Sequence, residues 1–223
     1  MIQYNFTNPL SAIDVNLRYL CWKVEKDRSK WPAILGKWIG EKRGADVAVA
    51  VLSGHRPLSQ LEIGSVVSAL DLDEHEFVYG NLPIADGISF VAKNLERLTS
   101  NASGQTKIEF AREIGVSPVT ISRWIGGTQV PDLKARRMIA LIFGLRDESD
   151  LGTVPIFLSF LPVTYGEQVA WINASMQEMI PAELRELFPA LYRIFAKFES
   201  TVSQPSVKEQ SLNRLRRMGV KKH

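Results

Sequence analysis

Apolar residues recur every three or four positions through most of this 223-residue sequence, and short polar or glycine-containing segments separate the apolar runs. This spacing places apolar side chains on one face of a helix, so it predicts an all-α protein. The segment VPIFLSFLPV at 154–163 is continuously apolar, and its pattern fits either a strand or a buried helix. Residues 167–180 and 181–198 again have the period of amphipathic helices.

Residues 106–125 predict two short helices with defined ends. Thr106 is placed to cap the first, in which Ile108, Ala111 and Ile114 share a face, and Gly115 is placed to end it in a left-handed conformation. Ser117 caps the second helix and Pro118 takes its first position, where a missing N–H group has no cost. After a glycine pair, Asp132 caps a further helix that offers Leu133, Ile139, Ala140 and Phe143 to the core.

The helix predicted at 117–125 is barely two turns long and has few apolar residues. Ile121 and Trp124 are three positions apart and therefore share its buried face. The residues left exposed are Val119, Thr120, Ser122 and Arg123. A helix anchored in this way, at an angle to the preceding one, can enter the major groove of DNA.

The stretch TKIEFAREIGVSPVTISRWIGGTQVPDLKARRMIALIFGL at 106–145 resembles the helix-turn-helix of phage-repressor and Cro-like (Xre-type) transcription regulators. The residues that carry the resemblance are Ala111, Gly115, Val116, Ile121, Trp124, Gly127 and Pro131. The resemblance implies a compact helical domain, sequence-specific DNA binding and, in most members, a dimer. Arg136 and Arg137 depart from it, because such proteins usually have core leucines there.

The resemblance also implies a role for each residue on the DNA side. Pro118, Val119, Ser122 and Arg123 would face the groove, with Arg123 donating two hydrogen bonds to a guanine and Val119 touching a thymine methyl group. Phosphate contacts are expected from Lys107, Thr120, Lys134 and the backbone N–H groups of Thr128 and Gln129, and Ser117 completes the interface. The structural alternatives are a surface ion pair of Arg123 with Glu109 or Glu113 and a solvated Lys107, while Trp124 is expected in the core.

An internal repeat covers the first two thirds of the sequence. Four segments recur in the same order: NLRYL at 16–20 and NLERL at 94–98, WIG at 38–40 and EIG at 113–115, VLSGHRPLS at 51–59 and WIGGTQVPD at 124–132, and VVSALDL at 66–72 and IALIFGL at 139–145. In the first copy, Ala45, Asp46, Val49 and Ala50 occupy the groove-facing positions. None suits base recognition, so we expect this copy to keep the fold and to serve packing, dimerisation or partner binding.

The repeat divides the chain into four parts. We predict two tandem lambda-repressor-like helical domains at 1–82 and 83–146, a mainly helical region at 147–200 and a flexible basic tail at 201–223. For the region at 147–200, self-association, closure over the repeats, an ordinary core helix and a small-molecule pocket all remain open. The tail either adds phosphate contacts or only increases solubility.

Charge is unevenly distributed along the chain. Residues 88–145 contain eight Lys and Arg against four Asp and Glu, and residues 201–223 contain six against one. Residues 14–80 contain nine against ten, and residues 146–200 contain four against eight. A polyanion is therefore the expected partner of the second repeat and the tail.

Other function classes find little support in the sequence. Cys21 is the one cysteine, which excludes an internal disulfide and a four-thiolate metal site and favours a reduced, cytoplasmic compartment. His55, His75 and His223 form no ligand or triad pattern, so we expect no enzyme activity, cofactor or metal. No signal peptide or membrane span is expected, because the start lacks a basic-then-apolar order and the longest apolar run is about half of the ~20 residues required.

The sequence therefore predicts a dimeric, DNA-binding transcription repressor that contacts double-stranded DNA through the helix at 117–125. The alternative is an antitoxin-like protein whose DNA binding serves autoregulation while another surface holds a protein partner. The acidic, apolar region after 146 favours that alternative.

Overall fold

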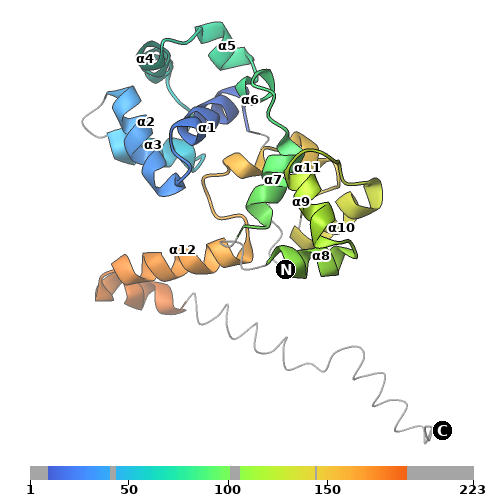
Figure 1. Cartoon of the computed structure of the whole chain (residues 1–223). Coiled ribbons are helices and arrows are strands. Elements are labelled where there is room, and N and C mark those ends of the chain that lie inside the picture. The colour runs from blue at the N-terminus through green and yellow to red at the C-terminus, as the bar shows by residue number, and fades with distance from the viewer. Residues whose placement is uncertain (1–9, 41–43, 101–105, 144, 190–223) are drawn as a thin grey trace, which may run out of the picture. The chain divides into compact units, whose positions relative to one another are not determined.

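The structure is a computed structural model that describes residues 10–40, 44–100, 106–143 and 145–189 (Figure 1). Every regular element in these ranges is helical and none is a strand, as the spacing of apolar residues predicts. The chain divides into two compact units between Trp171 and Ile172. The predicted basic tail and residues 190–200 lie outside the described residues.

The first group of helices contains α1 to α6. Their bounds are Ala12–Val24 for α1, Trp31–Ile39 for α2, Gly44–Leu52 for α3, Gln60–Leu70 for α4, Glu74–Tyr79 for α5 and Leu82–Ala85 for α6, with a 3₁₀ turn at Arg28–Lys30 before α2. Ser11 and Ser59 begin α1 and α4 as capping boxes, in which the side chain of the third helical residue bonds back to the cap. The core between these helices contains Leu17, Trp31, Leu35, Val51, Val66 and Phe77.

The second group contains α7 to α11 and one 3₁₀ helix. Their bounds are Phe90–Leu98 for α7, Lys107–Ile114 for α8, Pro118–Ile125 for α9, Leu133–Phe143 for α10, Asp150–Thr153 for α11 and Ile156–Leu158 for the 3₁₀ helix η3. Leu151, Ile156 and Val163 belong to the same core as Leu95, Phe110, Ile121, Trp124 and Ile139. The start of the region predicted at 147–200 therefore packs together with α7 to α10.

Asn94 ties α7 to the end of this group. Its side-chain amide donates to the carbonyl oxygens of Leu151 at 2.8 Å and Val154 at 2.7 Å, and its oxygen accepts from the backbone N–H of Phe157 at 2.9 Å. Asn94 is fully buried. A single side chain thus bonds three backbone groups where the chain turns from α11 into η3. The Val154 carbonyl also accepts from Ile156 N–H at 2.9 Å, whereas the Leu151 carbonyl and the Phe157 N–H depend on Asn94.

Asn16 makes the same three hydrogen bonds in the first group. Its amide donates to the carbonyl oxygens of Phe77 at 2.8 Å and Gly80 at 3.0 Å, and its oxygen accepts from Leu82 N–H at 2.9 Å. Asn16 and Asn94 are the first residues of the repeated NLRYL and NLERL segments. Both therefore fix a helix near the start of their group to the backbone at its end.

Two pairs of left-handed glycines recur in the same way. Gly40, at φ 75°, ends α2 as Gly115, at φ 81°, ends α8, and Gly54, at φ 77°, follows α3 as Gly127, at φ 69°, follows α9. Residues with a Cβ rarely adopt this conformation. The turns on both sides of α3 and of α9 therefore share the same backbone requirement.

A third apolar cluster joins the two groups within the first compact unit. It contains Val15 and Tyr19 from α1, Phe90 from α7, and Phe157 and Leu158 from η3. The segment at 154–163 is thus neither a strand nor a long buried helix. It forms a short 3₁₀ turn whose apolar side chains are shared between two cores.

Two residues differ from the sequence-based expectation about the core. Ile108 and Leu133 were expected inside, but they are 60% and 48% exposed. Each lies in the first turn of its helix, and the first buried residues of α8 and α10 are Phe110 and Ala135, two positions further along. Phe143 is partly buried and packs against the second core as expected.

Arg97 and Glu167 hold the beginning of α12 (Tyr165–Glu178) to the second group. The guanidinium donates to both carboxylate oxygens of Glu167, at 3.1 Å and 3.0 Å, and their side chains are only 5% and 13% exposed. Burial alone would raise the pKa of Glu167, but the hydrogen bonds and charge of Arg97, with Val163 N–H and the charge of Arg28, keep that pKa below its ordinary value. After α12 the backbone is helical again at 181–189.

We predict that Asn94→Ala lowers the free energy of unfolding by about 2 kcal/mol or more, because it leaves the Leu151 carbonyl and the Phe157 N–H, both buried, without partners. Urea denaturation measures the loss. Asn173→Ala, the same substitution on the exposed face of α12, is the control and should change stability by less than about 0.5 kcal/mol. Equal losses in the two variants would show that the amide has no anchoring role.

We also predict a pH dependence that is specific to Glu167. Its depressed pKa stabilises the fold above the unfolded-state pKa of about 4.3, and this contribution disappears as pH falls through the folded pKa. Glu167→Gln should therefore cost about 3 kcal/mol near pH 7, and the difference from the unmodified chain should shrink below about pH 4. Urea midpoints from pH 3 to 7 measure it, with exposed Glu178→Gln as control; parallel curves for Glu167→Gln and the unmodified chain would contradict it.

Candidate nucleic-acid interface

Helix α8 begins and ends with local hydrogen bonds that the sequence predicts. Thr106 accepts from Glu109 N–H at 3.2 Å, and the Glu109 carboxylate accepts from Thr106 N–H at 2.8 Å, which completes a capping box. At the other end, Gly115 N–H donates to the carbonyl oxygen of Ala111 at 3.0 Å. The hydrogen bonds from the Thr106 backbone and side chain hold the pKa of Glu109 below its usual value, so Glu109 stays ionised in its capping role.

The turn from α8 to α9 is short, and local hydrogen bonds close it on both sides. Val116 N–H donates to Ala111 oxygen at 2.9 Å, and the Ser117 hydroxyl accepts from Thr120 N–H at 3.1 Å. Pro118 occupies the first turn of α9, as expected. The direction of α9 relative to α8 is therefore set by a left-handed glycine and a serine cap only two residues apart.

Two side chains attach α9 to the core. Ile121 is 0% and Trp124 3% exposed, and α9 packs against α7 and α8. The indole N–H of Trp124 is buried without a hydrogen-bond partner among the described residues. Trp124 thus contributes packing to the core and is turned away from any position where it could stack on a base.

The opposite face of α9 is exposed to solvent. Pro118, Val119, Ser122 and Arg123 are all exposed, and Val119 is 59% exposed despite its apolar side chain. Thr120 is partly buried, and its hydroxyl lies 2.9 Å from the Ser117 hydroxyl. The predicted groove-facing residues therefore lie on one continuous, uncovered surface, with Thr120 at its edge.

Arg123 is not engaged in either of the expected ion pairs. None of the ion pairs formed within the described ranges involves Arg123. The Glu109 carboxylate is used in its capping box. The guanidinium of Arg123 is thus held at the end of a short helix with its donors directed to solvent.

The flanking residues divide into two kinds. Lys107 and Lys134 are exposed at the starts of α8 and α10, as phosphate contacts require. The backbone N–H groups of Thr128 and Gln129, however, point to the carbonyl oxygen of Arg123, at 3.0 Å and 3.4 Å. Both amides thus have an acceptor at the C-terminal end of α9, and the phosphate contacts expected through them stay a prediction.

The two arginines that depart from the resemblance, Arg136 and Arg137, both lie on α10. Arg137 is exposed and donates to Glu148 at 3.3 Å. Arg136 is partly buried, and its Nε atom has no partner among the described residues. The second core thus tolerates the arginines because Ala135 and Ile139, not these residues, face it.

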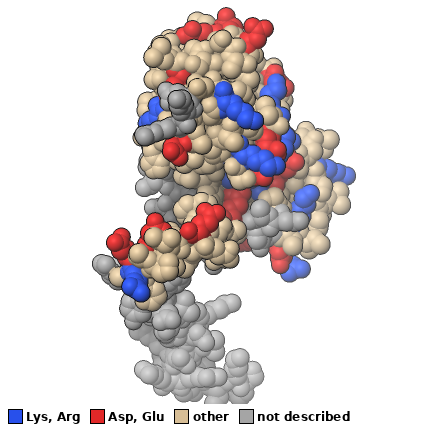
Figure 2. Space-filling model, turned by 90° about the vertical axis from the view of Figure 1, so that its left-hand side faces the viewer, with Lys and Arg blue, Asp and Glu red and all other residues tan. Residues whose placement is uncertain are grey.

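Helix α3 of the first group presents a different surface from α9. Ala45, Asp46 and Val49 are exposed and Ala50 is partly buried, and α3 contains neither lysine nor arginine. Acidic side chains gather over the α4–α5 end of this group, at the top of Figure 2. The exposed residues of α3 thus include one acid, Asp46, and no base, a combination that does not attract DNA phosphates.

The described residues contain no group of His, Cys, Asp or Glu that could hold a metal ion. Cys21 is fully buried on α1, and burial raises the pKa of its thiol to about 12. No helix in the described ranges has the length and apolar character needed to span a membrane.

Comparison with known proteins gives no further assignment. No protein-family model matches the chain, no curated protein is significantly similar to it, and no solved structure is significantly similar to its fold. The candidate interface therefore rests on the residues of the chain and their arrangement.

Proposed function

We propose that the chain is a sequence-specific DNA-binding transcription regulator that inserts α9 into the major groove. The observation that supports this most is the division of α9 into a buried face of two side chains and an exposed face that carries an unpaired arginine. A helix that serves only the core would bury more of its surface, because packing is what stabilises helices this short. An exposed helix face of this kind is what a recognition helix needs in order to contact base edges.

Five exposed residues of the interface have a proposed partner on DNA. Arg123 donates two hydrogen bonds to the N7 and O6 atoms of a guanine, and Val119 contacts a thymine methyl group. Ser122 can bond to either base edge. Lys107 and Lys134, on the helices beside α9, bind phosphates and contribute affinity without sequence preference.

We further propose that the first and second groups of helices are two copies of one lambda-repressor-like domain. The recurrent bonds of Asn16 and Asn94 and the four left-handed glycines support this. Helix α3 carries Asp46 and no lysine or arginine, so only the second copy is suited to contact DNA. One chain then recognises one half-site, so recognition of a palindrome requires two chains.

A homodimer is the proposed active form, and repression by blocking a promoter is the simplest action for it. The end of the described chain supports self-association because it leaves apolar side chains exposed. Those side chains are Val169, Trp171, Ile172 and Met176 on α12 and Ile180 after it. The same uncovered residues favour the alternative, an antitoxin-like protein that holds a different protein there; co-purification of an untagged neighbour would support it.

We predict that selection of binding sites from random duplexes recovers two copies of one half-site, and that Arg123→Ala abolishes preference at one guanine position. The expected loss is about 1–3 kcal/mol of discrimination at that position. Lys107→Ala should instead weaken binding to all sequences and reduce the slope of log K against log salt by about one.

Two control variants separate base recognition from charge. Arg185→Ala removes the same charge from an exposed position outside the second group, and Asp46→Ala alters α3; neither should change the selected sequence. If Asp46→Ala and Arg123→Ala had equal effects, both copies would contact DNA. If the unmodified chain selected no sequence, the proposed function would be wrong.

A further inference from the structure

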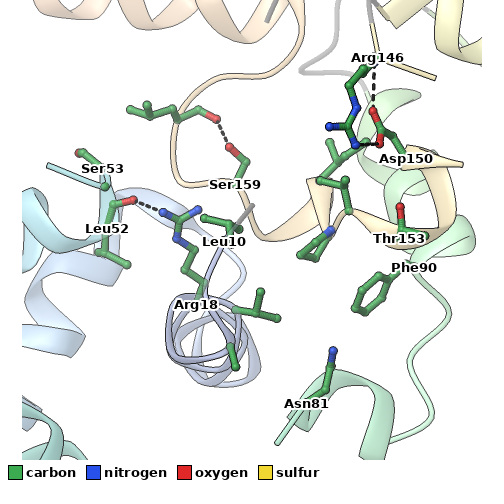
Figure 3. Close-up of a pocket in the computed structure, with 17 residues that line it drawn as sticks. Leu10, Arg18, Leu52, Ser53, Asn81, Phe90, Arg146, Asp150, Thr153 and Ser159 are labelled. Carbon is green, nitrogen blue, oxygen red and sulfur yellow. Dashed lines mark hydrogen bonds and ion pairs between the residues drawn. The ribbon is translucent and has the colours of Figure 1, made fainter. Parts of the chain in front are cut away.

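A hollow of about 720 Å³ lies between the two groups of helices, inside the first compact unit (Figure 3). It is lined by residues of α1, the end of α3, α11, and the segment that leads through η3 to Leu161. Binding sites for small molecules have volumes in this range and combine an apolar wall with a few polar groups. This hollow is separate from the exposed face of α9, none of whose residues line it.

Among the groups that line the hollow, Arg18 has many hydrogen-bond donors and few acceptors. It is 7% exposed, and in Figure 3 its side chain extends from α1 with Nη2 donating to the carbonyl oxygen of Leu52 at 2.9 Å. None of the ion pairs formed within the described ranges involves Arg18. A guanidinium has five N–H donors, so four of them lack a protein acceptor among these residues.

Arg97 shows what a structural arginine looks like in the same protein. It is 6% exposed, and it donates to the carbonyl oxygens of Ile156, Ser159 and Leu161 as well as to both oxygens of Glu167. All five donors are used and the charge is neutralised. Arg18 is equally buried and has one neutral acceptor, and burial lowers its pKa although Asp14, one turn away on α1, opposes this.

The remaining walls determine which anion would fit. Apolar side chains line most of the hollow: Leu10, Val15, Phe90, Pro155, Ile156 and Leu161. The other charged residues there are Arg146 and Asp150, which are bonded to each other at 3.3 Å and lie across the view from Arg18 in Figure 3. The lining therefore has two arginines against one carboxylate, and the excess positive charge is at Arg18.

We propose that this hollow binds a small amphipathic carboxylate, with its carboxylate on Arg18 and its hydrocarbon part against the apolar wall. One planar guanidinium fork matches one planar carboxylate. The bound anion supplies the charge and the acceptors that the protein does not supply. This inference does not depend on DNA binding, because carboxylate binding is measured on the protein without DNA.

The competing explanation is that Arg18 only caps the C-terminal end of α3 through Leu52. The two explanations differ in what Arg18→Gln does to the unliganded chain. Loss of a needed cap should lower the melting temperature by several degrees, whereas removal of a buried, unneutralised charge should leave it unchanged or raise it.

Calorimetric titration of the full chain with octanoate, phenylacetate and benzoate tests the proposal, with octanamide as an uncharged match for octanoate. We expect saturable binding of at least one carboxylate, with octanoate binding at least about tenfold more tightly than octanamide. Arg18→Gln should weaken carboxylate binding by a similar factor, Arg18→Lys by less, and Arg112→Gln, at an exposed position on α8, should leave it unchanged.

A second variant keeps the test decisive if Arg18 variants fail to fold. Leu161 is 46% exposed and lines the hollow, so Leu161→Trp should obstruct the hollow without disturbing the core and should abolish binding. Three results would overturn the proposal. They are equal affinity for octanoate and octanamide, unchanged carboxylate binding in both Arg18→Gln and Leu161→Trp, and no saturable binding of any of the three carboxylates.

Discussion

The burial of Ile121 and Trp124 is the contact on which the proposed function depends. An isolated helix of eight residues is unstable in water, so α9 exists because these two side chains enter the second core and because Ser117 and the turns around it satisfy its ends. The core that receives them is assembled from α7, α8, α10, α11 and η3. The buried amide of Asn94 holds α11 and η3 in place through hydrogen bonds to their backbone. Because α11 and η3 belong to the core that receives Ile121 and Trp124, Asn94 indirectly supports α9.

Under the proposal that the two groups of helices are copies of one domain, α3 and α9 are equivalent helices with different exposed residues. Helix α3 buries Ala48 and Val51 where α9 buries Ile121 and Trp124, and left-handed glycines stand at matching places around both helices. Core positions and turns are constrained by packing and backbone geometry. Exposed positions are not, and there α3 has Asp46 and Val49 where α9 has Val119 and Ser122. The same physics that preserves the fold thus leaves the surface free to differ.

Local features were predictable from the sequence because they depend on neighbouring residues. The caps Thr106, Ser117 and Asp132, the left-handed Gly115 and the buried pair on α9 follow from spacing and side-chain chemistry alone. The exposed positions of Lys107, Ser122 and Arg123 follow from the helix period.

Long-range features were not predictable in this way. The sequence shows that the asparagines of NLRYL and NLERL recur, but their partners are 57 to 66 residues away, so their role becomes visible only in the fold. Burial of Asp150 and Leu151 within a polar stretch, and the pairing of Arg97 with Glu167, likewise depend on tertiary contacts. The hydrogen bonds from the Thr128 and Gln129 amides to the Arg123 carbonyl likewise depend on the way in which α9 ends.

Backbone amide NMR of the full chain, titrated with a short DNA duplex that it binds, tests the central claim most directly. The largest changes in chemical shift should fall at 107 and 117–125, with further changes at the start of α10 and little change along α3. Changes concentrated on α3, or on the buried side of the second core with none at 117–125, would contradict the claim that the exposed face of α9 contacts DNA.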